Sequence, residues 1–121
     1  MGYESKLYIV ESHKGVVEDE NGLWYGRRIA EIDLSKAGIP QELFFTEKAD
    51  CYLYADDGNA KITEDRYGDK LTVCTDLPGF IAWMKEQESK EHYRRWGMAI
   101  ALLEAIKPED WRCVQVLHYG H

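Results

Sequence analysis

The sequence predicts an α+β domain, with a mostly antiparallel sheet of about five to six strands and one or two helices packed on one face. Short segments rich in β-branched and aromatic residues occur along the chain, and turn residues separate several of them. One long segment near the C-terminal end instead repeats its apolar residues at helical spacing.

A single globular domain, residues 1–121, accounts for the whole chain. A length of 121 residues is sufficient to bury a core without disulfides or a structural metal. The apolar fraction of 45% and the aromatic fraction of 12% are typical of a folded protein. The sequence contains no repeat, linker or low-complexity tract that would divide it.

The first half of the chain predicts two strands. Residues 6–11 (KLYIVE) combine β-branched and aromatic residues, and Asn21-Gly22 marks a turn before the next segment. Residues 28–34 then alternate as a half-buried strand does. One face carries the apolar residues Ala30, Ile32 and Leu34, and the other carries Glu31 and Asp33.

The middle of the chain predicts a β-meander. Its strands are residues 50–54, 60–64 and 70–75, separated by turns at 55–59 and 66–69. A last strand is predicted at residues 112–119, where Val114 and Val116 alternate with a glutamine.

Two helices should follow the meander. Asp76 can cap the backbone N–H groups of a helix that has Pro78 in its first turn. Helical spacing resumes later, with a stripe of Tyr93, Trp96, Ile100 and Leu103. Gly97 costs about 1 kcal/mol there relative to alanine, so we expect another backbone to approach it closely. The predicted order is β-β-β-β-β-α-α-β.

The charge of the chain excludes some classes of partner. A net charge of −7 and a pI near 5.1 disfavour direct contact with nucleic acid or an anionic membrane, since both attract basic proteins. The sequence shows neither a signal peptide nor about 18 consecutive apolar residues. We therefore expect a cytoplasmic protein.

No sequence motif specifies a catalytic site, cofactor or metal. Cys51, Cys74 and Cys113 are widely spaced and are predicted to be reduced thiols in the core. The pair His118 and His121 has weak metal-ligand spacing, because residues three apart in a strand point to opposite faces. We predict no catalytic residue, no cofactor and no metal, while an enzyme built on carboxylates with a distant histidine or tyrosine stays open.

Aromatic side chains beside carboxylates are the most informative feature. Tyrosine and tryptophan offer broad apolar contact and one polar tip, as protein interfaces require. The predicted interaction surface comprises Trp24, Tyr25, Glu31, Asp33, Tyr52 and Tyr54. Such an acidic and aromatic face would dock on a basic site of a protein partner.

Two alternatives stay open. One is a pocket for a nucleotide or other small ligand, in which the phosphate would be bound by one of Arg27, Arg28, Arg66, Arg94 and Arg95. The other is a small hydrolase or metalloenzyme. A homodimer formed through an edge strand would be compatible with any of these functions.

Residues 1–10 (MGYESKLYIV) and 24–38 (WYGRRIAEIDLSKAG) resemble small proteins encoded by phages and prophages of Gram-positive bacteria. The resemblance implies an accessory protein in the host cytosol. Such proteins often bind a host protein stoichiometrically or sequester a host signal molecule. It therefore favours a protein-binding function, with inhibition of a host defence system as one form.

Overall fold

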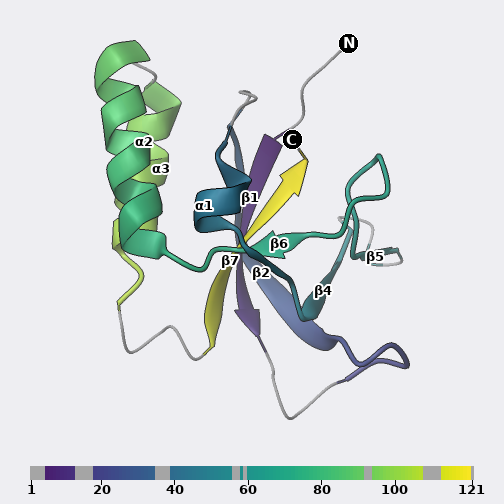
Figure 1. Ribbon diagram of the computed structural model, residues 1–121. Coiled ribbons are helices and arrows are strands. Elements are labelled where there is room, and N and C mark those ends of the chain that lie inside the picture. The colour runs from purple at the N-terminus through teal and green to yellow at the C-terminus, as the bar shows by residue number, and fades with distance from the viewer. Residues whose placement is uncertain are drawn as a thin grey trace.

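The computed structural model describes residues 5–12, 18–34, 39–55, 58, 60–91, 94–107 and 113–120. These residues form an α+β fold, which confirms the predicted class. A curled sheet lies beside a pair of helices. Two strands of this sheet, β4 (Cys51–Tyr54) and β5 (Lys61–Ile62), lie on the side away from that pair (Figure 1).

The strands and helices follow the predicted order with two additions. The strands are β1 (Ser5–Ser12), β2 (Trp24–Asp33), β3 (Glu47–Lys48), β4 (Cys51–Tyr54), β5 (Lys61–Ile62), β6 (Thr72–Val73) and β7 (Val114–Gly120), and the helices are α1 (Gln41–Phe44), α2 (Leu77–Glu91) and α3 (Arg94–Glu104). Strand β3 was not predicted, because a segment of two residues is too short to show a periodic pattern. Helix α1 lies within residues 35–47, where the sequence left open a short helical turn or an irregular crossing.

The sheet has seven strands, whereas we predicted about five to six. Their order is β3-β6-β7-β1-β2-β4-β5. The sheet is also mixed, because β2 and β4 are parallel while the other pairs are antiparallel. After β2 the chain passes through α1 and β3 before it reaches β4. This crossover allows β4 to run in the same direction as β2.

The predicted meander over residues 50–75 is partly wrong. Strands β4 and β5 form a hairpin, but β6 pairs with β3 and β7 at the opposite end of the sheet. Between β5 and β6 the buried Leu71 crosses the concave side: its N–H donates to Thr63 O at 3.2 Å, and its carbonyl accepts from Ala49 N at 2.8 Å. These bonds hold the two ends of the sheet close together.

Each face of the sheet has its own core, and β1 contributes to both by alternation. Leu7 and Ile9 pack with residues of α2 and α3 on the convex face. Tyr8 and Val10 pack with residues of β4 and β7 and with Leu71 on the concave face. The edge strands β3 and β5 have two residues each, so they offer little backbone for edge pairing, and the homodimer stays a prediction.

The helix start was predicted correctly, and the reason for Gly97 was not. Asp76 Oδ1 accepts a hydrogen bond from Gly79 N at 3.0 Å, so Asp76 caps α2 as expected. Gly97 is exposed, and within the described residues nothing lies within 4 Å of a Cβ added there. The expected close approach of another backbone is therefore absent from this part of the fold.

The cysteines only partly match the prediction of core thiols. Cys51 is buried, Cys74 is half-buried and Cys113 is exposed. Cys113 is exposed because it lies in a turn just before β7 begins. In the part of the chain that the structure describes, every helix is too short or too polar to cross a membrane.

Candidate functional site

Three of the predicted interaction residues gather on one face of β2 and β4. The parallel register pairs Tyr25 with Tyr52, and Tyr54 follows two positions later on the same side of β4. The ring centroids are 5.8 Å apart for Tyr25 and Tyr52, 5.7 Å for Tyr25 and Tyr54, and 5.6 Å for Tyr52 and Tyr54. We call these three residues the tyrosine surface.

The three rings differ in exposure. Tyr54 is 37% exposed, Tyr25 is half-buried and Tyr52 is only 3% exposed. Burial, followed by a hydrogen bond with Tyr54, raises the pKa of the Tyr52 hydroxyl above its ordinary value. Tyr52 is thus the buried member of the cluster, and Tyr25 and Tyr54 are its accessible members.

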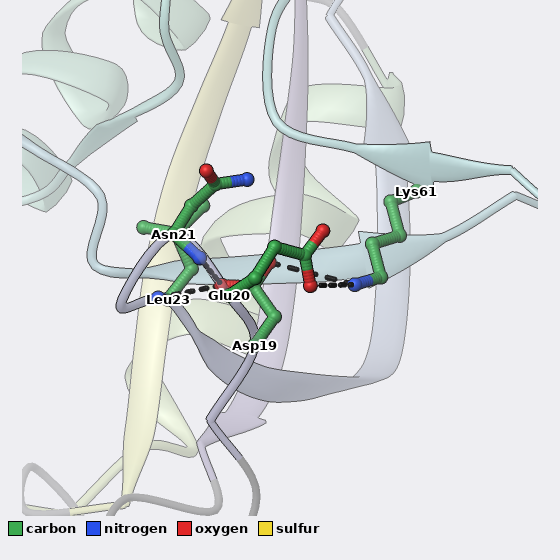
Figure 2. Close-up of polar contacts among 5 residues, drawn as sticks. All are labelled: Asp19, Glu20, Asn21, Leu23 and Lys61. Atoms are coloured by element: carbon green, nitrogen blue, oxygen red, sulfur yellow. Dashed lines mark hydrogen bonds and ion pairs between the residues drawn. The ribbon is translucent and has the colours of Figure 1, made fainter.

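A lysine and an acidic loop hold the tyrosine surface in place. Lys61 Nζ lies 4.5 Å from the centre of the Tyr52 ring, a cation–π contact. The same ammonium pairs with Asp19 Oδ2 at 3.5 Å and Glu20 Oε2 at 3.8 Å (Figure 2). Burial alone would lower the pKa of Lys61, but Glu20 and Asp19 outweigh burial and raise it.

Asp19 also folds its own loop. Its Oδ1 accepts hydrogen bonds from the backbone N–H groups of Asn21 and Leu23, each at 2.9 Å (Figure 2). The bond from Leu23, helped by Asn21 and Lys61, lowers the pKa of Asp19 below its ordinary value. The loop of residues 18–23 is therefore tied to β5 by a carboxylate that stays ionised at neutral pH.

The other predicted residues lie elsewhere. Trp24 precedes Tyr25 in β2, so alternation points its side chain to the opposite face. Glu31 and Asp33 also point away from the tyrosine surface, because their register partners are Tyr8 and Lys6 on the concave side. The three tyrosines of the predicted surface thus lie on one face of the sheet, and Trp24, Glu31 and Asp33 lie on the other.

Glu31 belongs to a second group of polar residues, which surrounds a cavity of about 300 Å³. We call this cavity the concave pocket; it is lined by Lys6, Tyr8, Arg28, Glu31, Ala55, Lys61, Ile62, Glu64 and Tyr119. Glu31 Oε1 lies 3.5 Å from Lys6 Nζ, and Oε2 lies 3.9 Å from Arg28 Nη1. One carboxylate is therefore bracketed by two cations.

A β-bulge brings Arg28 and Glu31 to the same face. Ile9 pairs with Ala30 while the next residue, Val10, pairs with Arg28, so Ile29 is an extra residue in β2. Without the bulge, residues three apart would point to opposite faces. The regular alternation that we read from the sequence gave no sign of it.

Tyr8 forms the floor of the concave pocket. Its ring lies edge-on to Tyr119, with centroids 6.0 Å apart and an interplanar angle of 87°. Burial, followed by the negative charge and hydrogen bond of Glu31, raises the pKa of the Tyr8 hydroxyl. Tyr8 is therefore protonated at neutral pH and donates to Glu31. Neither Lys6 nor Tyr8 was among the predicted site residues, although both alternate with apolar residues of β1.

Catalytic alternatives receive little support from the described residues. Ser5 Oγ lies 2.9 Å from His118 Nε2, but both residues are buried, and the imidazole lies against the Phe45 ring. Within the described ranges, no three His, Cys, Asp or Glu residues are grouped as metal ligands would be. His121 lies outside those ranges.

A second cavity, of about 370 Å³, lies beside the start of α2 and includes Cys74 and Asp76. Burial raises the pKa of the Cys74 thiol to about 11, so this thiol is neutral rather than nucleophilic. Asp76 already occupies the free N–H group of Gly79 at the helix terminus. Of the described residues that line this cavity, neither Cys74 nor Asp76 therefore presents a reactive group to a ligand.

Comparison with known proteins adds no assignment, since no family model, curated protein or solved structure matches this chain.

The tyrosine surface and the concave pocket lie on opposite faces of β2. They are joined through Arg28, whose Nη2 donates to the Tyr54 carbonyl at 3.5 Å.

Proposed function

We propose that this protein acts by binding a protein partner through the tyrosine surface. The observation that carries the proposal is the mutual packing of Tyr25, Tyr52 and Tyr54, with centroids 5.6 to 5.8 Å apart at a solvent-exposed face. Clustered tyrosines supply large amphipathic contact area, and residues of this kind dominate the binding energy of protein interfaces.

The cluster is rigid before any partner arrives. Tyr52 is buried under its neighbours, and Lys61 lies over its ring while pairing with Asp19 and Glu20. A surface held in this way loses little conformational entropy on binding, so more of its contact energy appears as affinity. This preorganisation supports a binding role for the surface.

The surroundings of the cluster favour a basic partner. Glu18 and Glu20 are exposed in the adjoining loop, and the side chain of Glu20 is 79% exposed. The whole chain carries a net charge of −7. Long-range attraction would speed association with a basic surface, and salt would weaken it.

The biological form of this proposal follows from the resemblance to phage accessory proteins. A small acidic protein that binds stoichiometrically can block a host protein by occupying its functional surface. Inhibition of a host defence protein is therefore the form that we propose.

Affinity capture with matched variants tests the proposal. Tagged wild-type protein, Tyr25→Ala/Tyr54→Ala and the control Tyr67→Ala are each incubated with lysate of a Gram-positive host. Tyr67 is 60% exposed, lies in the turn between β5 and β6, and is not a member of the tyrosine surface. We expect one partner to be retained by wild type and Tyr67→Ala and lost, by about tenfold or more, with the double variant. Equal retention by all three would refute the proposed surface.

A further inference from the structure

The geometry points to a second binding site: the concave pocket binds a small phosphate ester, with its phosphate group between Lys6 and Arg28. This site is separate from the tyrosine surface, although Lys61 lines the pocket and also lies over the Tyr52 ring. The site lies on the concave side of the sheet, whereas the tyrosine surface lies on the other face of β2 and β4.

The charge around the pocket differs in sign from that of the chain. Of the charged residues that line the pocket, Lys6, Arg28 and Lys61 are positive and Glu31 and Glu64 are negative, so the lining has a local charge of +1. Glu64 also lines the pocket, but its Oε2 lies 4.0 Å from the position of a Cβ on Gly68 and is thus turned toward the hairpin. An anion is therefore favoured at the β1–β2 side, although the net charge of the protein is −7.

The geometry of Glu31 shows that the two cations can bracket an oxyanion. Its oxygens lie 3.5 Å from Lys6 Nζ and 3.9 Å from Arg28 Nη1, longer than the roughly 2.8 Å of a tight charge-assisted hydrogen bond. A phosphate has more oxygens and a larger charge than a carboxylate, so it can displace the Glu31 carboxylate from between the two cations and draw both of them closer. The guanidinium of Arg28 offers planar, paired donors suited to phosphate.

The partial burial of these cations strengthens the attraction. The side chains of Lys6 and Arg28 are 28% and 24% exposed, so solvent ions screen their charges less than those of fully exposed residues. The cavity volume of about 300 Å³ is at the small end of ligand pockets. A monophosphate of a sugar fits this size, and Tyr119 and Ile62 provide surface for its organic part.

Titrating the isotope-labelled protein and recording amide NMR shifts tests this site. The probes are ribose 5-phosphate, orthophosphate and uncharged ribose. We expect saturable shifts at residues 6, 28 and 31 with both phosphate compounds, and affinity for ribose at least about tenfold weaker than for ribose 5-phosphate. Arg28→Gln should weaken ribose 5-phosphate binding by about tenfold or more, whereas Arg27→Gln should leave it within about twofold.

Arg27 is a matched control because it is the adjacent residue in β2 and is exposed on the other face. The amide spectrum of each variant reports whether it is folded. The proposal is overturned if the phosphate compounds produce no saturable shifts up to about 10 mM, if ribose binds as well as its phosphate, or if both arginine variants lose binding equally. Because only purified protein and small probes are used, failure here leaves the protein-binding proposal untouched.

Discussion

Arg28 and Glu31 lie on the same face of β2, with Nη1 and Oε2 3.9 Å apart, although they are three residues apart in a strand. The extra residue Ile29 between them causes this arrangement. As a result, β2 presents Tyr25 on one face and a cation–carboxylate group on the other. The two proposed sites therefore share this strand.

The pH dependence of stability should reveal the environment of Tyr8. Burial and Glu31 raise its folded pKa above the unfolded value of 10.0, so the neutral phenol stabilises the fold below about pH 10. This stabilisation is lost as the pH rises from about 10 toward the folded pKa. Urea unfolding at several alkaline pH values should show a steeper loss of stability for wild type than for Tyr8→Phe. If the free energy of unfolding fell equally steeply with pH in wild type and in Tyr8→Phe, Tyr8 would not be buried beside Glu31.

The hydrogen bond between Ser5 and His118 should contribute measurably to stability. Its Oγ–Nε2 distance is 2.9 Å and both side chains are buried, so Ser5→Ala removes a partner from a buried ring nitrogen. We expect a loss of about 1–3 kcal/mol in the free energy of unfolding, measured by urea denaturation. Ser89→Ala, on an exposed part of α2, is the control and should change it by less than about 0.5 kcal/mol. Equal effects of the two variants would contradict the buried bond.

Two glycines should respond in opposite ways to alanine. Nothing among the described residues lies within 4 Å of a Cβ at Gly97, so Gly97→Ala should stabilise α3 by about 0.5–1 kcal/mol. A Cβ at Gly26 would lie 3.2 Å from Tyr52 O and 3.3 Å from Cys51 Sγ, so Gly26→Ala should be destabilising. Thermal unfolding measures both. A loss of stability in Gly97→Ala would contradict the open space that the described residues leave around Gly97.

The role of Asp19 separates into two parts. Asp19→Asn keeps an oxygen for the N–H groups of Asn21 and Leu23 but loses the charge that attracts Lys61, whereas Asp19→Ala loses both. At neutral pH the melting temperature should therefore be highest for wild type, lower for Asp19→Asn and lowest for Asp19→Ala. Because the folded pKa of Asp19 is below its unfolded value of 3.8, the charge contribution should disappear as the pH falls below about 4. If wild type kept a higher melting temperature than Asp19→Asn below about pH 4, the stabilising role of the Asp19 charge would be contradicted.

Much of the fold could be predicted because its longer elements carry periodic patterns. The alternation from residue 30 to residue 33 and the Asp76 cap both correspond to what the structure shows, whereas the bulge at Ile29 interrupts the alternation predicted from Arg28. Strand β3 could not be predicted, since two residues carry no pattern. The parallel pairing of β2 with β4 also depends on the path of the chain between them, which local sequence does not specify.

The sites could be predicted only in part. The sequence identified Tyr25, Tyr52 and Tyr54 as amphipathic residues in strands, and the register of β2 and β4 brings them together. It placed Glu31 beside them, whereas strand alternation and the bulge at Ile29 direct Glu31 to the other face. Contacts between residues far apart in the chain decide such placements, and a single sequence contains no signal for a bulge.

Site-specific photo-crosslinking tests the central claim most directly. A photoreactive phenylalanine analogue is placed at position 54, or at position 67 as the control, and the protein is irradiated in cells of a Gram-positive host. We predict that position 54 gives one discrete covalent adduct with a host protein, because Tyr54 is the exposed member of the tyrosine surface, and that position 67 does not. An adduct from position 67 alone, or none from position 54, would contradict a protein-binding role for the tyrosine surface.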